Sequence, residues 1–102
     1  MNYKIDKKFW NKKKVFITGH TGFKGSWLSI FLTHLGAEVT GYSLKPNTKP
    51  SLFELANIRK IIKKSIIADV KNYSKLESEI NKSKATILFH LAPQPLVRYS
   101  DL

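Results

Sequence analysis

Three glycines, spaced three residues apart, separate two apolar runs of different character near the start of this chain. Residues 15–17 before them have the composition of a buried strand, and residues 27–32 after them have that of a helix. A strand, a glycine-rich turn and a helix, in that order, surround an anion with backbone N–H groups and a helix amino terminus. The spacing Gly19-x-x-Gly22-x-x-Gly25 therefore predicts a turn that holds the pyrophosphate of a dinucleotide.

Each glycine of this turn has a separate predicted task. Gly19 is expected to let the chain leave the strand sharply, because glycine adopts backbone conformations that other residues avoid. Gly22 has no Cβ, so the backbone can approach the phosphates, and Gly25 is expected to let the helix pack closely on the sheet. The simpler alternative is an ordinary strand-to-helix turn that binds no ligand.

The rest of the chain alternates between segments of strand and helix character. This alternation predicts an α/β fold, in which a parallel sheet carries helices on both faces. Right-handed crossovers put the strands in the order 3-2-1-4, which is the first, incomplete part of a Rossmann-type doubly wound sheet. The predicted strands cover residues 14–18, 38–44, 65–68 and 86–91, and the predicted helices cover residues 25–35, 52–56 and a segment after residue 74.

Local signals mark where these helices begin and end. Gly36 stands where a left-handed glycine commonly ends a helix. Ser51 with Glu54, and Ser74 with Glu77, have the spacing of capping boxes, in which a serine caps the first turn of a helix. Apolar residues recur at helical spacing along the first predicted helix: Trp27, Leu28, Phe31, Leu32 and Leu35.

The fourth predicted strand, residues 86–91, is almost entirely apolar. Such a strand is expected to be covered on both faces and paired on both sides, yet here it would lie at the edge of the sheet, where it invites aggregation. We therefore expect the front part of a larger fold: a polar lead-in at residues 1–13 and a partial NAD(P)-binding Rossmann domain at residues 14–102. The remaining strands and the substrate domain would be absent.

Composition excludes several other classes of protein. The chain has 102 residues, of which 42% are hydrophobic, and this suits one small globular domain. It has no cysteine, and His20 and His34 have no partner at ligand spacing, so we expect no metal site. No apolar run is long enough to span a membrane and no secretory signal is visible, so we expect a cytoplasmic protein without a membrane partner.

The net charge of +11 would suit a nucleic-acid partner, but the kind and spacing of the basic residues do not. Among 18 basic residues, Arg59 and Arg98 are the only arginines, and arginine is the residue that favours bidentate readout of bases and phosphates. The lysines are also scattered along the chain. We therefore interpret them as a solvated surface and expect no nucleic-acid partner.

Further site residues are expected at the carboxyl ends of the other strands, which line the ligand crevice of such a sheet. A carboxylate normally holds the adenosine ribose about 20 residues beyond the glycines, but Ser43 stands there. Ser43 can bond a ribose hydroxyl, and with Lys45 it could equally accept a 2′-phosphate, so the choice between NAD and NADP stays open. Asp69 could bond the adenine amino group; the alternative is a turn or helix-capping carboxylate. His90 is expected to be a buried strand histidine with one hydrogen bond.

Taken together, the turn and its surroundings resemble the amino-terminal signature of the CDP-glucose 4,6-dehydratases, which belong to the extended short-chain dehydrogenase/reductase superfamily. The glycine spacing alone indicates only the superfamily. Residues 18–28 (Thr-Gly-His-Thr-Gly-Phe-Lys-Gly-Ser-Trp-Leu) and 94–98 (Gln-Pro-Leu-Val-Arg) are much narrower. The similarity also covers residues 36–44, 50–56, 69–70 and 90–92.

The resemblance implies the amino-terminal, cofactor-binding part of a hydro-lyase that acts in deoxysugar and O-antigen synthesis. The family converts CDP-glucose to CDP-4-keto-6-deoxyglucose: a bound NAD takes hydride from C4, water leaves across C5–C6, and hydride returns to C6. The complete enzyme is expected to be a homo-oligomer. From the turn and the resemblance together, the candidate cofactor-binding residues are Gly19, Thr21, Gly22, Phe23, Lys24, Gly25, Ser43, Asp69, Val70, Leu91 and Ala92.

The family's catalytic residues, including its Tyr-x-x-x-Lys pair, are expected beyond the last residue, so no catalytic residue is assigned and the chain alone is expected to be inactive. Pro93 stands where the family usually has alanine, and proline offers no backbone N–H to a cofactor. Two alternatives remain: another nucleotide-sugar epimerase or 4,6-dehydratase of the same superfamily, and a standalone nucleotide-binding module without catalysis.

Overall fold

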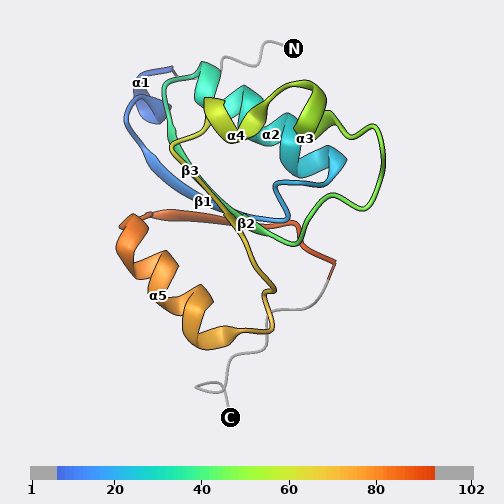
Figure 1. The fold of residues 1–102 in the computed structure, drawn as a ribbon. Helices are drawn as coiled ribbons and strands as arrows, with labels where there is room; N and C mark the ends of the chain where they lie inside the picture. Colours follow the sequence, from blue (N-terminus) through green and yellow to red (C-terminus); the bar gives the residue numbers. More distant parts are fainter. Residues whose placement is uncertain (1–6, 94–102) are drawn as a thin grey trace.

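The computed structural model describes residues 7–93, which form a sheet of four parallel strands between two layers of helices (Figure 1). The strands are β1 (Lys14–Thr18), β2 (Glu38–Ser43), β3 (Lys64–Ile67) and β4 (Ile87–His90). β1 pairs with β2 and with β4, and β2 also pairs with β3, all in parallel. The order β3-β2-β1-β4 confirms the predicted order and the α/β class.

Two layers of helices cover the sheet, with α2, α3 and α4 on one face and α5 on the other (Figure 1). The helices are α1 (Lys7–Trp10), α2 (Phe23–His34), α3 (Leu52–Leu55), α4 (Ile58–Ile61) and α5 (Tyr73–Ser83). Each face has its own apolar core. Val15 and Ile17 of β1 belong to the core under α2, and Phe16 belongs to the core under α5, because successive side chains of a strand point to opposite faces.

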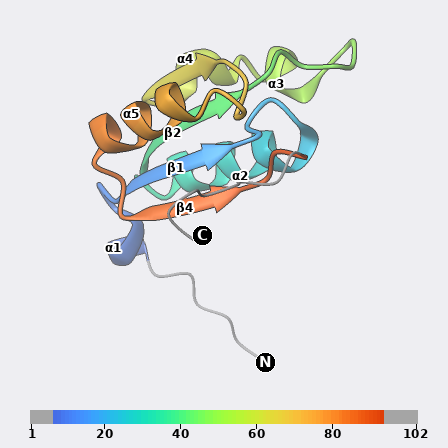
Figure 2. The ribbon, with the colours of Figure 1, turned by 90° about the horizontal axis from the view of Figure 1, so that it is seen from below.

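Within the described residues, β4 is an edge strand, as the sequence predicted. It pairs with β1 alone, and Figure 2 shows it at one margin of the sheet. Ile87 and Phe89 are partly buried against the core under α2, whereas the Leu88 side chain on the other face is 45% exposed. One face of this apolar strand is thus poorly covered by residues 7–93.

Gly36 ends α2 in the predicted way. Its φ of +92° lies in the left-handed region, where glycine carries no Cβ penalty. Its N–H donates to the carbonyl of Thr33 at 2.9 Å, and the N–H of Ala37 donates to that of Leu32 at 3.0 Å. These two bonds form a Schellman motif, which satisfies carbonyl groups that the helix end would otherwise leave free.

The buried face of α2 is made largely of small residues. Gly25, Ser26 and Ser29 are buried, whereas Trp27 and Phe31 are 54% and 42% exposed, although both belong to the apolar pattern that predicted the helix. The two serine hydroxyls are satisfied locally: Ser26 donates to the His20 carbonyl at 2.9 Å, and Ser29 donates to the Gly25 carbonyl at 2.7 Å. Small residues therefore bring the helix close to the turn and the sheet.

Of the two predicted capping boxes, one is confirmed and one is wrong. Ser51 caps α3: its Oγ accepts the N–H of Glu54 at 3.2 Å and donates to the Glu54 carboxylate at 3.1 Å. In α5, however, Asn72 is the cap, and its Oδ1 accepts the N–H of Lys75 at 3.3 Å. The helix begins before Ser74, because asparagine caps at least as well as serine and stands two residues earlier.

This correction can be tested with two single substitutions. Asn72→Ala should lower the free energy of unfolding by about 1 kcal/mol, the usual cost of losing an N-cap side chain. Ser74→Ala should cost much less, because Ser74 is exposed inside the helix. Equilibrium unfolding in urea measures both, and a larger loss for Ser74→Ala would restore the original capping box.

The predicted polar lead-in contains the short helix α1. Trp10 packs against the core under α2, and Phe9 meets the Trp10 ring edge to face at a centroid distance of 5.0 Å. The ammonium of Lys13 lies 4.4 Å from the centre of the Phe9 ring. Trp10 therefore docks this segment onto the core, and Phe9 packs on the Trp10 ring. Residues 94–98, which include Arg98 and carry part of the family resemblance, lie outside the described residues.

Candidate functional site

A hollow of about 230 Å³ lies at the carboxyl ends of the strands, where the sequence predicted the ligand crevice. Segments that follow all four strands contribute to it. Its lining residues are Gly19, Thr21, Gly22, Ser43, Leu44, Lys45, Pro46, Asn47, Val70, Leu91, Ala92 and Pro93. Seven of the eleven candidate cofactor residues are among them, and Phe23, Lys24, Gly25 and Asp69 are not.

Gly19 forms the sharp turn that leaves β1. Its φ is +84°, and its N–H donates to the carbonyl of Tyr42 on β2 at 2.9 Å. A Cβ at this position would lie 2.6 Å from the backbone nitrogen of Ala92 and 2.6 Å from the carbonyl carbon of Leu91. The turn and the segment after β4 therefore meet backbone to backbone, and only glycine fits between them.

Gly22 leaves an open cradle at the beginning of α2. It is the N-cap residue and has no side chain to bond the N–H groups of the first helical turn. A Cβ here would meet only the Gly19 carbonyl oxygen, at 3.6 Å, so the space beside Gly22 is otherwise free. Uncapped N–H groups at the positive end of a 12-residue helix can bind an anion.

Gly25 lies in close contact with the backbone of the glycine-rich turn. A Cβ at Gly25 would lie 2.0 Å from the carbonyl oxygen of Gly19 and 2.7 Å from the Cα of His20. The missing side chain of Gly25 thus allows a close approach, and the nearest atoms that a Cβ would strike belong to the glycine-rich turn at the end of β1. Gly25 packs against the backbone of the turn and does not line the hollow.

Ser43 and Thr21 form a hydrogen-bonded pair beside the hollow. Thr21 Oγ1 donates to the carbonyl of Leu44 and lies 2.8 Å from Ser43 Oγ. The single hydroxyl proton of Thr21 is used in its bond to Leu44, so the Ser43 hydroxyl is the donor to Thr21. The oxygen of Ser43 can then only accept a further hydrogen bond. Lys45 supplies a cation, and no carboxylate lines the hollow among the described residues.

The two candidates after β3 are placed differently. Val70 is buried and lines the hollow. The carboxylate of Asp69 accepts the N–H of Lys71 at 2.9 Å, and its backbone carbonyl accepts the Tyr42 hydroxyl at 3.2 Å. In this structure Asp69 is the turn carboxylate of the alternative interpretation, and its contact with adenine stays a prediction.

The end of β4 is tied to the end of β1. Thr18 Oγ1 lies 2.5 Å from His90 Nδ1 and accepts the N–H of Ala92 at 3.5 Å. His90 is partly buried and has the hydrogen bond that the sequence analysis expected. Leu91 and Ala92 line the hollow directly after it, together with the exposed Pro93. The contact between Thr18 and His90 therefore holds these two strand ends together beside the turn.

Residues 16–101 match the protein family described as GDP-mannose 4,6 dehydratase. The chain belongs to this dehydratase family. It is also 53% identical over 96 residues to the CDP-glucose 4,6-dehydratase of Salmonella typhimurium (strain LT2), which confirms the resemblance found in the sequence. That match covers 94% of this chain but 26% of the relative, so the chain spans about a quarter of the relative's length.

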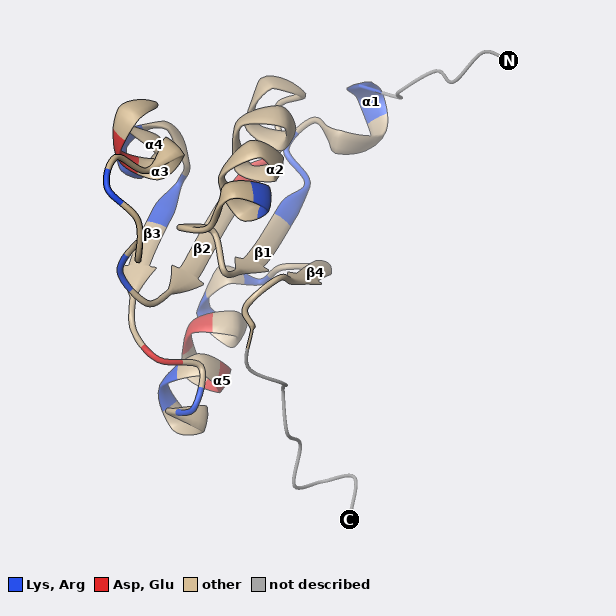
Figure 3. Ribbon diagram, turned by 90° about the vertical axis from the view of Figure 1, so that its right-hand side faces the viewer, with Lys and Arg blue, Asp and Glu red and all other residues tan. Residues whose placement is uncertain are grey.

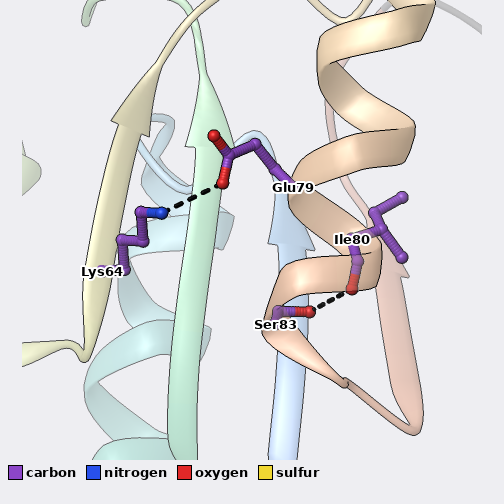
Figure 4. A network of polar contacts seen from close by, with 4 residues as sticks. All are labelled: Lys64, Glu79, Ile80 and Ser83. Carbon is purple, nitrogen blue, oxygen red and sulfur yellow. Dashed lines mark hydrogen bonds and ion pairs between the residues drawn. The ribbon is translucent and has the colours of Figure 1, made fainter.

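A second hollow, of about 350 Å³, lies at the opposite edge of the sheet. It is lined by the first residues of three strands, Lys14, Glu38 and Lys64, and by the end of α5. Lys64 bridges to Glu79 at 3.0 Å, and Figure 4 shows this pair reaching from β3 to α5. The hydrogen bond from Lys64 lowers the pKa of Glu79. Ligands of doubly wound sheets bind at the carboxyl edge, so family membership points to the first hollow.

Basic residues are spread over the fold. Figure 3 shows Lys and Arg segments in α1, β1, α2, β3 and α5, on several sides of the molecule. Within residues 7–93, no three acidic or histidine side chains gather as metal ligands do. None of the helices in this part of the chain combines the length and apolarity needed to cross a bilayer.

The sequence did not predict some of the residues near the site. Pro46 and Asn47 line the hollow, and the signal for them was the proline-bracketed loop after β2. The buried position of His20 had no local signal, because its partners lie far along the chain. One Tyr-x-x-x-Lys spacing occurs, Tyr3 with Lys7, but it precedes β1 and Tyr3 lies outside the described residues.

Proposed function

We propose that this chain is the cofactor-binding part of an enzyme that converts CDP-glucose to CDP-4-keto-6-deoxyglucose with a bound NAD. The observation that carries the proposal is the open space at Gly22, which lines the hollow at the strand ends and is the N-cap residue of α2 without a side-chain cap. Membership in a nucleotide-sugar dehydratase family, and 53% identity to a CDP-glucose 4,6-dehydratase, support this choice of substrate and cofactor.

The residues around the hollow suggest how the dinucleotide would lie. The pyrophosphate would rest on the turn from Gly19 to Gly22, against the amino terminus of α2. The adenosine would lie toward Ser43 and Val70, and the nicotinamide would lie toward Leu91 and Ala92. NAD would supply the hydride acceptor, and the role of these residues is to bind and orient it. NADP stays an alternative, because Lys45 lines the hollow and no carboxylate does among the described residues.

The experiment uses the complete protein that carries this chain. It is incubated with NAD and either CDP-glucose or GDP-mannose, and the products are followed by proton NMR. We expect the methyl signal of a 6-deoxy sugar from CDP-glucose and no change in GDP-mannose. Conversion of GDP-mannose alone would show that the substrate assignment is wrong.

A complete protein that binds NAD but acts on neither sugar would favour the standalone nucleotide-binding module. The 102-residue chain is the matched comparison. It should bind NAD without turnover, because the proton-transfer residues are proposed to lie outside it. Turnover by the chain alone would contradict that part of the proposal.

A further inference from the structure

His20 is part of the glycine-rich turn, but its side chain is buried on the face of the sheet that α2 and α3 cover, and it does not line the hollow. Its ring lies against Gly41 of β2. A Cβ on Gly41 would lie 2.3 to 2.6 Å from three ring atoms of His20, so the missing side chain of Gly41 makes the space that the imidazole fills. The ring therefore crosses β2 on the face covered by α2 and α3.

The ring has one hydrogen bond and one aromatic contact. Nε2 lies 2.8 Å from the hydroxyl of Ser65 on β3, and the ring meets Phe53 of α3 edge to face at a centroid distance of 5.3 Å. Nδ1 is buried and has no hydrogen-bond partner in the described part of the chain. Such an atom costs stability, so an apolar side chain would serve the core better. The polar ring is thus better explained by what it holds in place.

The backbone of His20 belongs to the cofactor cradle. Its neighbours Gly19 and Thr21 both line the hollow. Its carbonyl accepts the Ser26 hydroxyl at 2.9 Å, and its Cα is one of the atoms that a Cβ on Gly25 would strike. A side chain fixed between β2, β3 and α3 therefore fixes the path of the turn.

We propose that His20, held by its hydrogen bond to Ser65, is a positioning residue that sets the glycine-rich turn for the dinucleotide phosphates. This inference rests on the proposed function, because it assigns the hydrogen bond between His20 and Ser65, called the His20–Ser65 brace below, to cofactor binding. The His20–Ser65 brace links β3 to the turn across β2. Its loss leaves Gly19 and Gly22 in place but lets the turn deviate from the geometry that fits the phosphates.

A double-mutant cycle on NAD affinity tests the brace at a temperature well below unfolding. Ser65→Ala should weaken NAD binding about fivefold, the usual effect of one hydrogen bond. His20→Leu should weaken it about tenfold or more. Their combination should be no weaker than His20→Leu alone, since Ser65 has then already lost its partner. His20→Gln, whose amide can reach Ser65, should restore most of the affinity.

Ser83→Ala is the matched control, because Ser83 donates to the Ile80 carbonyl at the far end of α5 and should not affect NAD binding. If His20→Leu does not fold, the Ser65→Ala arm still decides the question. Equal NAD affinity in wild type and Ser65→Ala, or additive losses in the double variant, would overturn the brace while the proposed function stands. A wild-type protein that does not bind NAD would overturn both.

Discussion

Replacement of Gly25 by alanine should lower the free energy of unfolding by about 2 kcal/mol or more, although alanine is the better helix former. Helix propensity alone predicts a gain of about 1 kcal/mol for this change inside α2. The new Cβ, however, would lie 2.0 Å from the carbonyl oxygen of Gly19 and 2.7 Å from the Cα of His20. Both are backbone atoms, so the turn itself must move, and overpacking of this kind costs about 1–3 kcal/mol or more.

Gly22→Ala is the matched control for this experiment. Its Cβ would meet only the Gly19 carbonyl oxygen at 3.6 Å, and the φ of −77° at Gly22 suits any residue. Urea unfolding followed by circular dichroism should therefore place Gly22→Ala near wild type and Gly25→Ala far below it. A Gly25→Ala variant as stable as wild type would show that α2 does not pack on the turn in the way described.

Acid should destabilise the protein through His20. Burial lowers the pKa of His20 from 6.5 to about 4 in the folded protein. The neighbours that face the ring, Gly41, Ser65 and Phe53, carry no charge that could compensate a proton. Above pH 6.5 neither the folded nor the unfolded state is protonated at this site. Below it the unfolded state takes up a proton first, so stability falls with pH until about pH 4.

The size of this effect follows from the shift in pKa. About 2.5 pH units correspond to a loss of about 3 kcal/mol between pH 6.5 and pH 4. His20→Gln has no titratable group at this position, so the difference in unfolding free energy between wild type and this variant isolates the histidine from the carboxylates. That difference should change by about 3 kcal/mol in favour of the variant as the pH falls. A constant difference would mean that His20 is not buried as a neutral ring.

The sequence predicted the parts of the fold that depend on local pattern. The strands around residues 15–17 and 87–90 are apolar runs, and Gly36 stands at a helix end, so periodicity and single-residue preferences are enough to find them. The strand order follows from the handedness of crossovers. The position of the hollow follows from the order, because carboxyl ends of parallel strands meet at one edge.

Contacts between distant segments could not be predicted in this way. The backbone that Gly25 approaches belongs to the turn, which depends on the angle at which α2 leaves β1. The fit of His20 against Gly41 and Ser65 joins residues up to 45 positions apart, and each looks ordinary in its own strand or turn. The prediction of the α5 cap was wrong for a local reason. Asn72 and Ser74 both suit an N-cap, and only the observed start of the helix separates them.

We propose that the turn and the amino terminus of α2 hold the cofactor's pyrophosphate, and NAD affinity decides whether they do. NAD is titrated by calorimetry into wild-type protein and into Gly22→Ala, which is expected to keep the fold but to place a methyl group in the cradle. We expect saturable binding by wild type and at least tenfold weaker binding by the variant. Equal affinity of the two proteins for NAD would contradict it.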